Sequence, residues 1–406
     1  MEIPPRAFDV FLDRRQRRPS SDRDDLVLNI HLHHSAKPLA DFETLKMARI
    51  DELLRQMKSQ DASDLHLTSG SAPYMRVHGD MSKLNYREVS AETARGLIFE
   101  ILTEKQREIF TESWDLDLSY PLGGVGRFRV NVFMQRNGIA AVFRIIPEKI
   151  KSIKELDLPE QLGKLIDVSE GLVLVTGPTG SGKSTTLASM IHTINIEQQA
   201  HIITIEDPIE FVHDNHKSLI SQREVSSHTK SFGSALRAAL REDPDIILVG
   251  EMRDLETISL AITAAETGHL VFGTLHTNSA IKTVDRVIDV FPEVQQAQIR
   301  VMLSESLRGV ASQVLLPRPD HNGRVPVVEV LVNTPAIANL IREGKTFQIS
   351  SAMQTGRAQG MVTFETSVNE LIRRELVSRE VGTNFLRRRG GHYQSPGANA
   401  SMRLAD

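Results

Sequence analysis

Eight residues in the middle of the chain, GPTGSGKS at 177–184, constrain its fold more than any other feature. They match the P-loop pattern of a glycine, four residues and then Gly-Lys-Ser, in which the curled backbone aims successive N–H groups at phosphate oxygens. The pattern requires a strand before it and a helix after it, and the apolar run 172–176 and the helical segment 184–194 fit both. We therefore expect a nucleotide-binding loop made of Gly177, Pro178, Thr179, Gly180, Ser181, Gly182, Lys183, Ser184 and Thr185.

Two side chains of this loop have expected chemical roles. Lys183 is expected to bridge the β- and γ-phosphates of ATP, and Ser184 to ligate Mg²⁺. The N-terminus of the following helix adds partial positive charge, which favours bound phosphate. A chance match in a glycine-rich loop lacks the flanking strand and helix, so the sequence predicts ATP and Mg²⁺ as ligands.

Strands and helices alternate from about residue 160 to 317, which predicts an α/β core whose mostly parallel sheet is covered on both faces. Polar residues follow three of its apolar runs, 202–205, 246–249 and 270–275. Ligands of parallel sheets bind beyond the carboxyl ends of the strands. We therefore expect one crevice to be lined by the phosphate loop and by Glu206, Glu210, Glu251 and His276.

Hydrolysis of ATP assigns roles to these side chains. It needs a carboxylate that deprotonates water, a second that holds the water shell of the metal, and a donor to the γ-phosphate. Glu251 is expected to act on Mg²⁺ through water, Glu206 or Glu210 to be the general base, and His276 to sense the γ-phosphate. The alternative for each is a solvated turn residue or a helix cap, and for His269 a structural role is equally well supported.

An alternating strand at 126–133 carries a second candidate group. Its period of two puts Arg127, Arg129 and Asn131 on one face, and adjacent guanidiniums suit neutralisation of phosphate charge. Arg144, in the next expected strand, is a third member of the group. The alternative is an ordinary solvent-facing strand with surface arginines.

Composition excludes several other kinds of site. The chain has no cysteine, so disulfides, thiolate zinc sites, iron–sulfur clusters and cysteine nucleophiles are excluded. A net charge of −4 and 5% aromatic residues argue against nucleic acid as a partner. No apolar run approaches the roughly 18–20 residues of a membrane helix, which predicts an intracellular protein without a membrane span of its own.

The pattern along the chain predicts four stretches. Residues 1–46 have balanced charges, several prolines and no apolar periodicity, so we expect a disordered extension in which His31, His33 and His34 are solvated. Met47 opens the first periodic helix, and one hypothesis is that translation begins there. The remaining stretches are an α+β domain at 49–150, an ATPase core with C-terminal helices at 160–376, and a flexible tail at 382–406.

Four segments resemble those of the secretion ATPases of type II secretion and type IV pili. They are GPTGSGKS, ITIEDPIEF at 203–211, IILVGEMRD at 246–254 and GHLVFGTLHTNSA at 268–280. Within the family, SDLHL at 63–67, the absence of the tetracysteine zinc site usual in assembly ATPases, and AIANLIRE at 336–343 are similar to the pilus-retraction branch. Ala338 departs from that branch, in which arginine is usual.

The resemblance implies a RecA-like core with a PAS-like N-terminal domain. It also implies a homohexamer in which Glu210 is the general base, Glu251 is the metal-binding acid, and arginines of the N-terminal domain complete a neighbouring subunit's site. The motor is then expected to retract type IV pili for twitching motility, with an integral platform protein and, indirectly, pilin as partners and without zinc. Its expected location is cytoplasmic, peripheral to the inner membrane at the pilus base.

Three other functions stay open. One is an accessory retraction motor, or an assembly ATPase of pili or type II secretion. A second is a regulatory protein whose bound nucleotide signals without sustained turnover. A nucleic-acid translocase, which shares the ring and the loop, is disfavoured by the charge and by the scarcity of aromatic residues.

Overall fold

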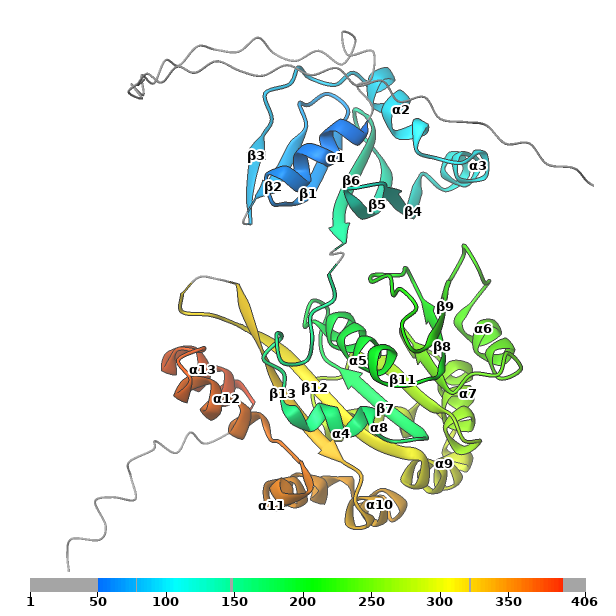
Figure 1. Ribbon diagram of the computed structural model, residues 1–406, viewed down its shortest axis with the longest axis vertical. Coiled ribbons are helices and arrows are strands. Elements are labelled where there is room, and N and C mark those ends of the chain that lie inside the picture. The colour runs from blue at the N-terminus through cyan, green and yellow to red at the C-terminus, as the bar shows by residue number, and fades with distance from the viewer. Residues whose placement is uncertain (1–49, 78, 147–148, 321–322, 390–406) are drawn as a thin grey trace, which may run out of the picture. The chain divides into compact units, whose positions relative to one another are not determined.

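The computed structural model describes residues 50–77, 79–146, 149–320 and 323–389, which form two sheets with their helices (Figure 1). The predictions made for residues 1–46 and for Met47 lie outside these ranges. No helix in the described ranges has both the length and the apolar character needed to cross a bilayer.

The first sheet has six strands in the order β3-β2-β1-β6-β5-β4, and all of its neighbouring strands are antiparallel. Helix α1 buries Ile50, Leu53, Leu54 and Met57 in the same hydrophobic core as the strands. The elements of this unit are α1 (Ile50–Ser59), β1 (Ala62–Thr68), β2 (Tyr74–Val77), β3 (Asp80–Lys83), α2 (Ala91–Glu100), α3 (Glu104–Ser113), β4 (Asp115–Leu122), β5 (Gly126–Gln135) and β6 (Gly138–Ile146).

The second sheet has seven strands in the order β13-β12-β7-β11-β10-β8-β9. Five neighbouring pairs are parallel and only β12 and β13 are antiparallel, so the predicted α/β class with a mostly parallel sheet is confirmed. Its strands are β7 (Gly171–Thr176), β8 (His201–Glu206), β9 (Leu219–Glu224), β10 (Ile246–Val249), β11 (Leu270–Leu275), β12 (Leu307–Pro317) and β13 (Arg324–Val332).

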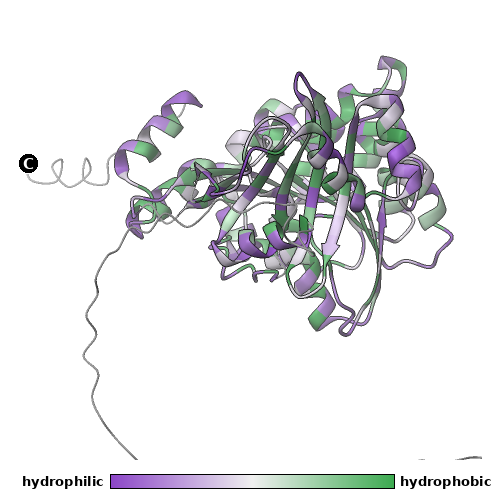
Figure 2. Ribbon diagram, turned by 90° about the horizontal axis from the view of Figure 1, so that it is seen from above, coloured by the Kyte–Doolittle hydropathy of each residue, from purple (hydrophilic) through white to green (hydrophobic). Residues whose placement is uncertain are grey.

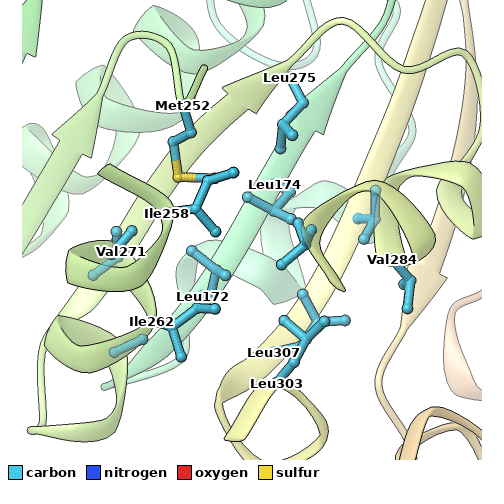
Figure 3. Close-up of a cluster of buried hydrophobic side chains, with 14 of the residues drawn as sticks. Leu172, Leu174, Met252, Ile258, Ile262, Val271, Leu275, Val284, Leu303 and Leu307 are labelled. Carbon is cyan, nitrogen blue, oxygen red and sulfur yellow. The ribbon is translucent and has the colours of Figure 1, made fainter. Parts of the chain in front are cut away.

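Helices cover both faces of this sheet, because alternate residues of its buried strands point to opposite sides. Leu172 and Leu174 of β7 pack with the α6–α9 side, as Figure 3 shows for Ile258 and Val284. Val173 and Val175 pack instead against α4 and α5. Figure 2 shows the resulting contrast between apolar strands and polar outer helix faces. The helices are α4 (Gly163–Ile166), α5 (Lys183–Glu197), α6 (Phe232–Ala239), α7 (Leu255–Glu266), α8 (Ala280–Asp289), α9 (Glu293–Ser306), α10 (Pro335–Arg342) and α11 (Ile349–Thr355), with short 3-10 turns at Glu160–Leu162, Thr346–Gln348 and Gly356–Gln359.

The last two helices correct the prediction of a flexible tail from residue 382. Helices α12 (Phe364–Arg373) and α13 (Arg379–Arg388) pack against β13, and Leu386 is buried in their shared core. Gly382, which suggested a loop, lets the helices approach closely, since a Cβ there would lie 2.7 Å from Ile372. The tail prediction was therefore wrong for residues 382–388, whereas residues 390–406 lie outside the described ranges.

Candidate active site

The phosphate loop joins the buried strand β7 to helix α5. Gly180 and Gly182 have φ values of +75° and +87°, which lie in the left-handed region that favours glycine. At Gly177 a Cβ would lie 2.2 Å from the carbonyl oxygen of Gln313, so only glycine fits against β12 there. These positions give the loop the curled backbone that its sequence pattern predicts.

Lys183 is the first residue of α5, and its side chain is buried. Its Nζ donates hydrogen bonds to the carbonyl oxygens of Gly177, at 2.9 Å, and Pro178, at 3.3 Å. Burial lowers the pKa of Lys183, while the charges of Glu251 and Glu210 act in the opposite direction. The two carboxylates therefore lie close enough to stabilise the ammonium.

Glu251 follows β10 and contacts His276, which follows β11. Nε2 of His276 lies 2.9 Å from Oε1 of Glu251, and Arg253 donates to Oε2 at 2.6 Å. Burial raises the pKa of Glu251, but the hydrogen bonds and charges of Arg253 and His276 outweigh it, and the net direction is down. Glu251 is accordingly an ionised carboxylate at neutral pH.

Glu206, the last residue of β8, has a raised pKa, in contrast to Glu251. Its Oε1 accepts hydrogen bonds from Thr204, at 2.6 Å, and from Gln222, at 3.1 Å. Burial raises its pKa to about 7, and the nearby charge of Glu210 also acts upward, against the lowering effect of those hydrogen bonds. The charge of Glu210 thus acts on Glu206, which carries a proton for part of the time at neutral pH.

Backbone hydrogen bonds tie the ends of these strands together. The amide of Gly250 donates to the carbonyl of Ile205, and the amide of Met252 donates to that of Thr274. The parallel register puts Val249 opposite both Ile205 and Gly273, so β8, β10 and β11 end at one edge of the sheet. Contacts and charge interactions thus link Lys183, Glu206, Glu210, Glu251 and His276.

His269 does not belong to this group. It precedes β11 at the opposite edge of the sheet, and its Nδ1 lies 3.0 Å from the carbonyl oxygen of Ala264 at the end of α7. Its contacts fit the structural role.

The predicted arginines lie on the first sheet. Arg129 of β5 stands directly opposite Arg144 of β6, and Arg144 in turn stands opposite Asp64 of β1. Arg144 donates to the buried Asp64 carboxylate at 2.7 Å, so its charge is balanced within the sheet. Among the described residues, neither Arg127 nor Arg129 has such an ion-pair partner.

A cavity of about 300 Å³ adjoins the phosphate loop. Gly182 and Thr185 form the side of the cavity toward the loop. The rest of the lining is apolar, polar and charged, and consists of Lys151, Glu155, Leu156, Asp157, Leu158, Thr186, Gln313, Leu315, Arg318, Arg324, Val325 and Pro326.

Two contributors were missed by the sequence analysis. Arg253 neutralises Glu251, and Gln313 of β12 contacts the phosphate loop. The available signal for Gln313 was a polar pair, Ser312-Gln313, between the apolar residues 309–311 and 314–316.

The chain is similar to a known family and to several known proteins. The family model described as "Type II/IV secretion system protein" matches residues 40–383. The chain is 55% identical over 331 residues to "Type IV pilus retractation ATPase PilT" of Pseudomonas aeruginosa, an alignment that covers 82% of this chain and 96% of that protein. It is 53% identical over 343 residues to "Twitching motility protein" of Neisseria gonorrhoeae, covering 84% and 91% of the two chains.

Two further relatives widen the comparison. "Type IV pilus ATPase PilU" of Pseudomonas aeruginosa is 41% identical over 321 residues, covering 79% of this chain and 84% of that protein. The solved structure described as "Crystal Structure of the Pilus Retraction Motor PilT and Bound ADP" superposes with a TM-score of 0.78 at 48% identity, covering 83% of this chain and 96% of that one.

The raised pKa of Glu206 predicts a pH-dependent effect of Glu206→Gln. Between pH 4.5, its ordinary pKa, and about 7, the folded protein holds a proton that the unfolded chain has lost. Wild type therefore loses stability as pH rises through this window, whereas the neutral glutamine does not. The variant should gain up to about 3 kcal/mol relative to wild type between about pH 5 and about pH 8, measured by urea unfolding. A difference that is constant over this range contradicts the shift.

Proposed function

Because the chain belongs to the type II/IV secretion system protein family, we propose that it is an ATP-driven motor that retracts type IV pili and so supports twitching motility. The observation that carries this proposal is the 55% identity to PilT over 96% of that protein, against 41% to PilU. The chain is an ATPase of this family, and the carboxyl edge of its second sheet is the site where ATP is hydrolysed.

The site supports a division of roles among its acidic residues. Glu210 is the general base that deprotonates the attacking water, and His276 donates to the γ-phosphate. Glu206, which accepts hydrogen bonds from Thr204 and Gln222 and is partly protonated, supports Glu210 instead of replacing it. Lys183 carries the positive charge that the β- and γ-phosphates require.

The donor set of the site also fits Mg²⁺, with Ser184 and Glu251 as the residues that would hold it. Mg²⁺ keeps several waters and takes only one or two carboxylates beside the phosphates, so a dedicated cluster is not required. Within the described ranges, no three histidine or acidic side chains are grouped to hold a metal by themselves. Since Glu251 is already bonded to Arg253 and His276, contact through water suits it better than direct ligation. When bound, the metal neutralises charge on the phosphates.

The cavity beside the loop suits the nucleoside part of ATP. It begins at Gly182 and Thr185, where the phosphate chain leaves the loop, and Leu156, Leu315 and Val325 offer an apolar surface to a base. Arg324 offers donors to the sugar and its phosphate, whereas Asp320 already engages Arg318.

We further propose that the motor is a homohexamer whose arginines act between subunits. Arg127 and Arg129 have no ion-pair partner among the described residues and share one strand face, which supports a role toward phosphate of a neighbouring subunit. Arg144 is the weaker candidate because Asp64 already engages it. The ring is proposed to bind an integral platform protein at the cytoplasmic face of the inner membrane and to act on pilin through it.

Glu210→Gln should lower ATP turnover by about 10²–10⁴-fold, because the amide cannot accept the proton of the attacking water. Nucleotide affinity should persist, since Lys183 and the loop are unchanged. Phosphate release and equilibrium binding measure the two effects, with exposed Glu197→Gln as the matched control. Wild-type turnover no faster than that of the variant contradicts the motor and favours a regulatory protein.

Co-expression of two inactive variants tests whether Arg129 acts on the site of a neighbouring subunit. Arg129→Ala and Glu210→Gln should each lose most activity alone. Mixed rings should recover part of it, because an Arg129→Ala subunit keeps its base and receives the arginine of its Glu210→Gln neighbour. Arg136→Ala, an exposed arginine of the same unit, should behave as wild type. A mixture no more active than the sum of the separate variants contradicts action between subunits.

Deletion of the gene in its host tests retraction. Cells should carry long pili that do not retract, and twitching should stop, because assembly continues unopposed; electron microscopy and colony spreading measure these outcomes. Restoring the wild-type gene should reverse both effects, and restoring the Glu210→Gln gene should not. Absent pili indicate an assembly ATPase instead, and retraction that persists at reduced strength indicates an accessory motor.

A further inference from the structure

Gln313 lies in β12, directly against the phosphate loop, and its side chain is only 4% exposed. Its Nε2 donates to the carbonyl oxygen of Ser181 at 2.7 Å, and its Oε1 accepts from the hydroxyl of Thr186, also at 2.7 Å. One buried amide thus joins the tip of the loop to the first turns of α5. Its donor and its acceptor atom both have partners, which fixes its orientation.

The glycines of the loop pack closely against Gln313. A Cβ on Gly182 would lie 2.8 Å from Nε2 of Gln313, and one on Gly177 would lie 2.2 Å from its carbonyl oxygen. The two glycines therefore allow the loop to pack on β12 from both ends, and the amide fills the space between them.

The residue before Gln313 holds the start of the same loop. The hydroxyl of Ser312 lies 2.7 Å from that of Thr176, the last residue of β7. Thr283 of α8 donates to Thr176 at 3.2 Å and also lies 2.6 Å from Thr277, the neighbour of His276. Strand β12 consequently anchors both ends of the loop.

Peptide geometry gives the bond to Ser181 a direct consequence. In a trans peptide the C=O of one residue and the N–H of the next point in opposite directions. Because Gln313 fixes the Ser181 carbonyl toward β12, the N–H of Gly182 points away from β12. That is the orientation in which a loop N–H is available to a phosphate oxygen.

We propose that Gln313 is a positioning residue that sets the direction of the phosphate-binding N–H groups by holding the Ser181 peptide through its side-chain amide. This role rests on the proposed function, since it concerns the same nucleotide site. In this role Gln313 acts through the loop backbone, to which its amide is bonded.

Two substitutions test the proposal by different means. Gln313→Glu puts a carboxylate oxygen opposite the Ser181 carbonyl, so a donor becomes a second acceptor, and Gln313→Met removes both hydrogen bonds at nearly constant volume. Each should raise the Kd for Mg·ADP by about tenfold or more, measured by isothermal titration. Using ADP keeps this readout independent of hydrolysis.

The structure offers a matched control at the other end of β12. Asn333 is also an amide that donates to two backbone carbonyls, those of Ser304 at 2.9 Å and Leu307 at 2.8 Å, but it lies away from the loop. Asn333→Leu should lower the thermal midpoint as much as Gln313→Met does while leaving the Kd for Mg·ADP within about twofold of wild type. A merely structural role for Gln313 predicts the same pattern for both variants.

Thr186→Val provides a second route if the Gln313 variants do not fold. Removing the hydroxyl leaves the Oε1 of Gln313 without its partner, so the Kd for Mg·ADP should rise by about threefold. The double variant Gln313→Met/Thr186→Val should bind Mg·ADP no more weakly than Gln313→Met alone. Wild-type affinity in both Gln313 variants, or in Thr186→Val where those do not fold, overturns the proposal. Failure of wild type to hydrolyse ATP counts instead against the proposed motor, because the ADP comparison still decides the role of Gln313.

Discussion

A lysine ammonium buried beside a glycine loop is the constraint on which the site depends. Removing an ion from water costs on the order of several kcal/mol unless partners compensate it, and burial lowers the pKa of Lys183 accordingly. Glu251 and Glu210 supply the opposing charge, although they follow different strands from the lysine. Only a sheet in which β7, β8, β10 and β11 run parallel brings all of these strand ends to one edge, so the fold and the charge balance require each other.

The acidic residues of the site differ in the direction of their pKa shifts. Glu251 is kept ionised by Arg253 and His276, whereas Glu206 is raised to a pKa of about 7 by burial and by the charge of Glu210. The partners of each glutamate, and not its residue type, therefore determine how readily Glu206 and Glu251 ionise.

The parts of the fold that depend on local pattern were predictable from the sequence. The phosphate loop, the buried parallel strands and the Asn137-Gly138 hairpin between β5 and β6 all follow from neighbouring residues. Strand β13 pairs with its sequence neighbour β12, and Gly382 suggested a loop within α13, so neither element was predicted. Gln313 was missed because its amide bonds a carbonyl 132 positions away, and Arg253 because the sequence does not show that its guanidinium bonds Glu251.

Charge accounting also supports the proposed role of the arginines of the first sheet. The guanidinium of Arg253 is already bonded to Glu251 and is balanced by it. A transferring phosphoryl group spreads negative charge over its equatorial oxygens, and an additional arginine is the usual means of neutralising it. Arg127 and Arg129 lack ion-pair partners among the described residues and lie on a sheet of their own, so their charge is available. In the proposed hexamer, a site completed by arginines of a neighbouring subunit can respond to movement of that subunit's first sheet, which is the coupling that a mechanical ATPase requires.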